Sequence, residues 1–210
     1  MKNLLKQIIH ELKEHIPFTS TAAFVSIVLT LIVLELNLIK STTSIFYIFH
    51  PIHVFFSAIV SAALLYKYKK NIILSLFAGI FISVAIGSIS DAIFPFLGSS
   101  LIGIPISFHL PAIENPLIIL GAGLLGSITG IISKKTKFPH FIHVFVSAFA
   151  SLLYIFAYSS DFTITRLFSI LIITIIAVIV PCCLGDIVFP LLLNKSSKEK
   201  SEVSSHGHTH

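Results

Sequence analysis

Two pairs of histidines lie inside long apolar segments of this 210-residue chain. His50 and His53 form one pair, and His140 and His143 form the other. The i, i+3 spacing within each pair places both imidazoles on one face of a helix. Imidazole nitrogens, together with carboxylate oxygens, suit zinc, ferrous iron, manganese, nickel or cobalt. The pairs therefore predict sites that handle such a metal ion, or protons.

Acidic residues accompany the histidine pairs. Asp91 and Asp186 each begin an Asp-X-X-Phe-Pro segment in an apolar part of the chain. A charge at the centre of a bilayer costs from roughly 3 to more than about 10 kcal/mol, so ionisable groups that persist there face a partner, a cavity or an ion. We expect one aspartate to join each histidine pair, and a glutamate or histidine from the other half of the chain to complete each site. The candidate metal ligands are His50, His53, Asp91, His140, His143, Asp186, His15, Glu114, His109 and Cys182.

Four members of this set allow a second interpretation. His15, His109 and Glu114 lie near the expected membrane interfaces, where water solvates an ionisable group as readily as a metal binds it. Cys182 lies one turn before Asp186, where a thiolate would add affinity for soft metals. A buried cysteine is also a common small packing residue. Both interpretations stay open at these positions.

Small residues and prolines surround the histidines. Four serines recur at every fourth position, a spacing typical of close helix packing: Ser57, Ser61, Ser147 and Ser151. Pro51 stands inside the first histidine pair, and Pro139 directly precedes the second. We expect these prolines to break their helices and to free carbonyl groups that line a polar pathway.

The composition indicates that lipid surrounds most of the chain. The sequence is 55% hydrophobic and 11% charged, with no tryptophan, which leaves too little polar surface for a soluble domain of this length. Its apolar stretches are close to the roughly 20 residues that a helix needs to cross a bilayer. We predict an all-α integral membrane protein with six transmembrane helices, over residues 17–38, 44–66, 71–97, 112–133, 138–158 and 166–193.

Basic residues give the expected orientation. A formal net charge of +5 would suggest nucleic-acid binding in a soluble protein, but here the positions of the lysines explain it. With six spans, twelve of the 14 lysines and arginines fall on one side of the membrane, and only Lys40 and Arg166 on the other. The positive-inside rule then predicts a protein of the cell membrane (inner or plasma membrane) with both termini in the cytoplasm. The histidine pairs are expected to form two similar clusters, one in each leaflet.

The chain contains an internal repeat. The segment His53-Val-Phe-Phe-Ser-Ala-Ile-Val-Ser61 matches His143-Val-Phe-Val-Ser-Ala-Phe-Ala-Ser151 at six of nine positions. Each copy contains three expected spans, an odd number, so the second copy is inverted in the bilayer, as in many secondary transporters. The predicted organisation is a lead-in over 1–16, a first repeat over 17–97, an external loop over 98–111, an inverted second repeat over 112–193 and a tail over 194–210.

Both predicted cytoplasmic ends are polar. Residues 1–16 have apolar side chains at helical spacing, which indicates either an amphipathic helix along the membrane surface or an ordinary charged lead-in. The tail ends with His206, His208 and His210 at alternate positions. Such tails bind divalent metals weakly, so the tail is a candidate for capturing or delivering an ion.

The function that these features favour is secondary transport of a divalent transition metal. Two three-helix halves with intramembrane histidines and acidic residues resemble, in architecture, the small metal exporters of the lysine-exporter superfamily. That resemblance implies export. The chain has no H-x-x-x-x-D-H segment of the kind found in nickel/cobalt transporters. We expect alternating access for Zn, Fe, Mn, Ni or Co, with zinc or iron first, driven either by the ion's own gradient or by proton exchange at the histidines.

The expected partners follow from the same features. They are the metal ion and the lipid bilayer, without nucleic acid, and a homodimer stays open. The chain has no G-x-x-x-x-G-K-S/T loop, so we expect no nucleotide to be hydrolysed.

Other classes of function stay open beside metal transport. An intramembrane zinc hydrolase would need three ligands, an open water site and a carboxylate base, and two near-equal clusters argue against it. A haem-binding electron carrier would use histidines facing each other across helices as axial ligands. A proton-coupled carrier of an organic solute is a further transport variant.

Overall fold

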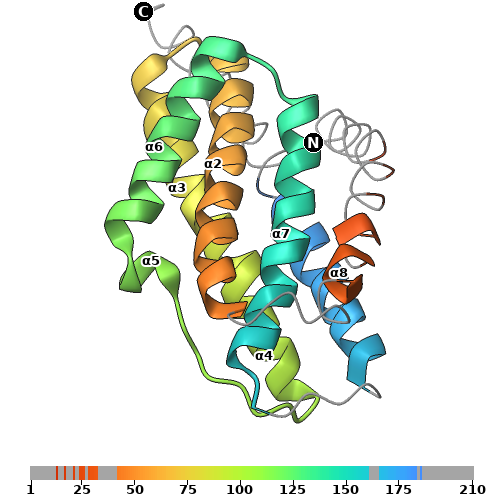
Figure 1. Ribbon diagram of the computed structural model, residues 1–210. Coiled ribbons are helices and arrows are strands. Elements are labelled where there is room, and N and C mark those ends of the chain that lie inside the picture. The colour runs from red at the N-terminus through yellow and green to blue at the C-terminus, as the bar shows by residue number, and fades with distance from the viewer. Residues whose placement is uncertain are drawn as a thin grey trace, which may run out of the picture.

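The structure is a computed structural model that describes residues 42–160 and 166–183, Gly185, and residues 13, 17, 21, 24–26 and 28–32. The described part of the chain is a bundle of helices without a strand (Figure 1). Its elements are α2 (Thr42–Lys69), α3 (Ile72–Ser88), the π-helix η1 (Ile89–Ile93), α4 (Phe94–Leu101), α5 (Pro111–Glu114), α6 (Pro116–Ser133), α7 (Lys137–Tyr158) and α8 (Leu167–Cys183). Residues 24–26 and 28–32 are also helical.

Four helices in the described part of the chain are long and apolar enough to cross a bilayer. They are α2, the continuous stretch Ile72–Leu101, α6 and Phe138–Tyr158, and Phe168–Cys182 is a shorter apolar helix. The prediction of a helical chain is confirmed, and the four helices have the length and composition of membrane spans. The first and last expected spans, 17–38 and 166–193, lie partly outside the described residues.

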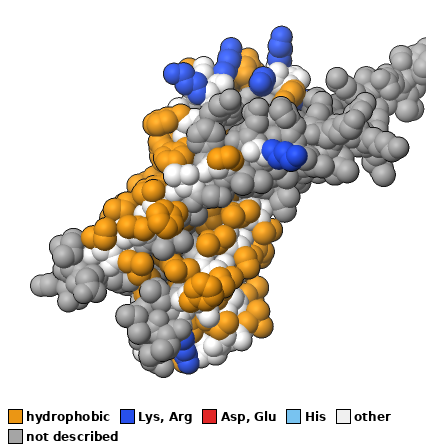
Figure 2. All heavy atoms as spheres, turned by 90° about the vertical axis from the view of Figure 1, so that its right-hand side faces the viewer, with side chains coloured by type: hydrophobic (Ala, Val, Ile, Leu, Met, Phe, Trp, Pro, Cys, Tyr) orange, Lys and Arg blue, Asp and Glu red, His pale blue; other side chains and the backbone are white. Residues whose placement is uncertain are grey.

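Polar side chains are buried inside this bundle, and many large apolar side chains are exposed on its outside. Ser57, Ser83 and Ser147 have no exposed surface, whereas the Phe81 side chain is 69% exposed and Leu117 is 86% exposed. Figure 2 shows apolar side chains over the middle of one face. Water penalises exposed apolar surface of this kind, whereas lipid does not. The distribution therefore fits a bilayer as the surrounding solvent.

Lysines gather at one end of the bundle. α2 ends in Lys67 and Lys69, and the link between α6 and α7 carries Lys134 and Lys135. Nζ of Lys134 lies 5.8 Å from the centre of the Tyr66 ring, so the two helix links share this end. Figure 2 shows basic side chains gathered there. Long basic side chains at the ends of apolar helices reach the lipid headgroups.

Glycines let α6 lie directly against α2. A Cβ atom on Gly126 would overlap the Phe55 carbonyl, and one on Gly130 would overlap the Ile59 carbonyl. Both carbonyls belong to α2, so the two backbones touch at these points. Membrane helices associate through such small residues because their apolar side chains gain little by leaving lipid.

The link between α4 and α6 differs at both ends from the predicted loop over 98–111. The helix continues past residue 97 to Leu101 as α4, so the link begins at residue 102. At its other end the chain forms α5, and α6 begins at Pro116 rather than at residue 112. Asn115 separates the two helices with φ −134° and ψ 56°. A residue before proline is disfavoured in the α region, and proline itself fits the first position of a helix, which explains the break.

The prediction that the prolines break their helices is wrong. α2 continues through Pro51 from Thr42 to Lys69. Neighbouring helices in membrane proteins compensate for the hydrogen bond that such a proline removes. Pro139 lies in the first turn of α7, where the N–H groups have no partner within the helix and a missing one costs little.

A glycine pair in α6 tests the contact with α2. Gly126→Ala should lower the free energy of unfolding by about 1–3 kcal/mol, because the added methyl group meets the α2 backbone. Gly121→Ala is the matched control, since nothing lies within 4 Å of its added methyl group and both changes gain the same helix propensity. Unfolding of purified protein by sodium dodecyl sulfate in mixed micelles measures both. Equal stability of the two variants would contradict the close contact.

Candidate metal centre

Asp91 is the centre of a buried polar group. It lies on η1 and has no exposed surface. Its Oδ2 atom lies 2.9 Å from Nδ1 of His50 and 2.6 Å from Nδ1 of His53. These are distances of hydrogen bonds between an imidazole and a carboxylate. The i, i+3 spacing on α2 thus presents both imidazoles to one carboxylate oxygen.

Two serines bind the other oxygen of the same carboxylate. The hydroxyl groups of Ser90 and Ser147 donate to Oδ1 of Asp91 at 2.7 Å and 2.9 Å. The hydroxyl of Ser151 lies 2.9 Å from the Ser90 carbonyl and 2.8 Å from the Ser147 carbonyl, and so joins α7 to η1. Sequence reasoning assigned Ser147 and Ser151 to helix packing and did not single out Ser90. The only signal for Ser147 was its place in the repeat, four residues after His143.

The π-helix η1 carries both the Asp91 carboxylate and Ser90, whose hydroxyl donates to it. The Phe94 N–H bonds the Ile89 carbonyl, five residues earlier, instead of the usual four. Pro95 explains the wider turn, because its ring would collide with the Asp91 carbonyl in a regular α-helix and it has no N–H to offer. Single π turns inside α-helices occur frequently at functional sites.

The two histidine pairs meet at one place. The ring centroids of His53 and His143 lie 4.4 Å apart. α2 and α7 run antiparallel, since Phe46 near the start of α2 contacts Tyr154 near the end of α7, with ring centroids 5.3 Å apart. The prediction of separate clusters in the two leaflets is therefore wrong. The repeat identified equivalent residues, but the offset between the two helices brings those equivalents face to face.

Cys182 of α8 reaches the same group. Its Sγ atom lies 3.9 Å from Nε2 of His53 and 3.6 Å from Oγ of Ser147. His140 lies one turn from His143 on α7, with the two ring centroids 5.7 Å apart. All of these side chains are buried. The described residues of both histidine pairs, one aspartate and one cysteine thus form a single polar centre inside the helices.

Two sets of side chains in this centre have the geometry to hold an ion. We call His50, His53 and Asp91 the carboxylate set, and His53, His143 and Cys182 the thiol set. Within each set, one ligand atom from each residue lies within 4.8 Å of the others. Bond lengths to zinc of about 2.0–2.3 Å put two ligands of a tetrahedral ion roughly 3.3–3.6 Å apart. Small rotations of the side chains would bring either set onto one ion.

His109 and Glu114 lie outside the buried centre. Nδ1 of His109 lies 3.0 Å from Oε1 of Glu114, and the Tyr47 hydroxyl donates to Oε2. Burial alone would raise the pKa of Glu114, but the hydrogen bonds from Tyr47 and His109 outweigh it and lower that pKa below its ordinary value. Tyr47 precedes His50 by one turn of α2, so this exposed carboxylate lies toward the end of the bundle opposite the lysines.

Some expected ligands lie outside the described residues. They are His15 and Asp186, and with them most of the lead-in 1–16 and all of the tail 194–210.

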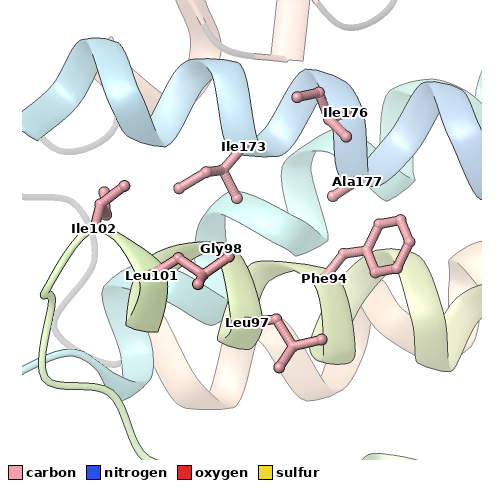
Figure 3. A pocket seen from close by; sticks show the side chains of 8 residues that line it. All are labelled: Phe94, Leu97, Gly98, Leu101, Ile102, Ile173, Ile176 and Ala177. Carbon is pink, nitrogen blue, oxygen red and sulfur yellow. The ribbon is translucent and has the colours of Figure 1, made fainter.

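A pocket between α4 and α8 has a different character. It has a volume of about 360 Å³, and Figure 3 shows the carbon side chains that surround it. Its lining consists of Phe94, Leu97, Gly98, Leu101, Ile102, Ile173, Ile176 and Ala177. Since these residues offer no ligand atom, the pocket suits hydrocarbon, such as a lipid chain, rather than an ion.

The fold and the centre together define the class of the protein. It is a helical protein with the spans of a membrane protein and with histidine, aspartate, serine and cysteine side chains buried between them. Comparison of the chain with protein-family models, with curated proteins and with solved structures finds no match. Its function is therefore inferred from the geometry of the centre.

A serine pair tests the hydrogen bonds to the carboxylate. Ser147→Ala should lower the free energy of unfolding by about 1–3 kcal/mol, because Oδ1 of Asp91 loses a donor in a buried environment. Ser127→Ala is the control, since the buried Ser127 hydroxyl has no hydrogen-bond partner among the described residues. Mixed-micelle unfolding compares the two. If Ser127→Ala is as destabilising as Ser147→Ala, the hydrogen bond from Ser147 to Asp91 does not stabilise the fold.

Proposed function

We propose that this chain is a secondary transporter, and specifically an exporter, of a divalent transition metal ion, with zinc or iron the first candidates. The observation that carries the proposal is the convergence of His50, His53 and Asp91 inside apolar helices. Burying these groups in a bilayer is costly, and a bound cation that neutralises the carboxylate offsets that cost. The donor atoms are those that zinc and ferrous iron accept.

The hydrogen bonds of the carboxylate set favour exchange of metal for protons. In each His–Asp pair a proton lies between the imidazole nitrogen and the carboxylate oxygen. When an imidazole carries a proton on both nitrogens, a metal ion takes the place of the proton on the nitrogen that it binds, so metal entry releases one proton and metal release restores it. This is the coupling expected of a carrier that uses a proton gradient.

We further propose six spans arranged as two inverted repeats. Supporting this, the two copies of the repeated segment lie on α2 and α7, which are antiparallel and touch at the equivalent residues His53 and His143. An inverted pair of this kind allows two nearly equivalent states, open to opposite sides. The lysine-rich end would face the cytoplasm, and both termini with it, by the positive-inside rule.

An intramembrane zinc hydrolase is a second candidate. The meeting of both histidine pairs favours it, because an enzyme needs one good site rather than two equal ones. The two functions differ in the fate of the ion. A hydrolase retains its zinc through catalysis, whereas a transporter loads the ion on one side of the membrane and releases it on the other.

The test compares metal binding and metal flux in one set of variants. The background is the full-length chain with the three tail histidines replaced, His206→Ala, His208→Ala and His210→Ala. In this background, His53→Ala and His143→Ala should each lower the retention of zinc or iron by at least about tenfold. Loss of even an outer partner of a metal ligand usually costs that much affinity. His109→Ala is the control, because His109 lies outside the buried centre. Elemental mass spectrometry measures retention, and proteoliposomes with an enclosed chelator measure flux.

The outcomes separate the candidate functions. A metal transporter is supported if His53→Ala and His143→Ala each lose both metal retention and metal flux while His109→Ala keeps both. Retention without flux points to the hydrolase. Full flux in both centre variants would contradict the proposal. Uptake of an organic solute that does not depend on metal would indicate a carrier of that solute.

A further inference from the structure

His53 stands between the two ligand sets. Its Nδ1 atom faces Oδ2 of Asp91 at 2.6 Å, and its Nε2 atom faces Sγ of Cys182 at 3.9 Å. The same imidazole therefore belongs to the carboxylate set through one nitrogen and to the thiol set through the other.

A neutral imidazole has one nitrogen lone pair, and its other nitrogen carries the proton. If His53 binds an ion through Nδ1, its Nε2 carries the proton and points at the sulfur. If it binds through Nε2, Nδ1 carries the proton and donates to Asp91. The thiol set therefore lacks this ligand whenever the carboxylate set uses it, and the reverse also holds.

Ser147 joins the two sets as well. Its hydroxyl donates to Oδ1 of Asp91 at 2.9 Å, and the Cys182 thiol donates to the same hydroxyl oxygen at 3.6 Å. When a metal–sulfur bond forms, the thiol loses its proton, and this donation to Ser147 ends. Occupation of one set thus changes the hydrogen bonding of the other.

We propose that the chain binds one ion at a time at two alternative sites, the carboxylate set and the thiol set, between which His53 passes the ion. This inference rests on the proposed metal transport and names the class of its substrate. A set with a thiolate and two imidazoles prefers borderline and soft ions, such as zinc and cobalt, over manganese or magnesium. The thiol set thus selects which metal ion is carried, and the carboxylate set accepts or releases that ion.

Cobalt(II) is the probe, because a thiolate ligand gives it a sulfur-to-metal charge-transfer absorption in the near ultraviolet. In the full-length background without the tail histidines, the protein should bind one cobalt ion per chain and show this band. Cys182→Ser should still bind cobalt through the carboxylate set but lose the band. Cys183→Ser, the matched control at the next position, should keep it. Asp91→Asn should raise the band per bound cobalt, because every ion then occupies the thiol set.

Each result bears on a different claim. Bound cobalt without a sulfur band in the unsubstituted centre overturns the thiol site and leaves the proposed transport standing. Two cobalt ions per chain overturn the sharing of His53. An equal loss of the band in Cys182→Ser and Cys183→Ser overturns the assignment to Cys182. Absence of cobalt binding overturns this inference together with the proposed function.

Discussion

A single carboxylate buried among apolar helices governs the arrangement of the bundle. Asp91 has no exposed surface, and an isolated charge at such a depth is prohibitively costly. Each of its oxygens therefore accepts two hydrogen bonds, from α2 on one side and from η1 and α7 on the other. Three parts of the chain that are far apart in sequence must meet at this group. The hydrogen bonds that the buried carboxylate needs thus also determine how these helices pack.

Close backbone approach makes that meeting possible. A Cβ atom on Gly87 of α3 would lie 2.8 Å from a Val54 methyl group and 3.3 Å from the His50 ring, so only glycine lets α3 approach the histidine face of α2. Serines supply small polar side chains in the same interior. Lipid offers no hydrophobic drive for helices to associate, so small residues and hydrogen bonds have to hold them together.

From the sequence, the residues of the centre could be predicted, but not which of them come into contact. The two histidine pairs and Asp91 stood out because ionisable groups are costly in apolar segments. The contact between His53 and His143 depends on how far α2 and α7 are offset along their axes, which the repeat alone does not determine. The π-helix was also missed, because the single proline that favours it, Pro95, is consistent with several local structures. The four long apolar helices of the described residues begin and end within a few residues of the predicted spans, since hydropathy determines such helices directly.

The meeting of His53 with its repeat equivalent His143 has the form of an isologous contact, in which the same patch appears on both partners. In a dimer of identical chains, symmetry forces the surroundings of such a contact to be identical as well. A fused chain escapes that constraint, and each half can diverge alone. Counting back four residues from the aspartate of each Asp-X-X-Phe-Pro segment gives Gly87 in the first half and Cys182 in the second. Fusion thus permits a thiol on one side of a symmetric contact where the equivalent position on the other side has no side chain.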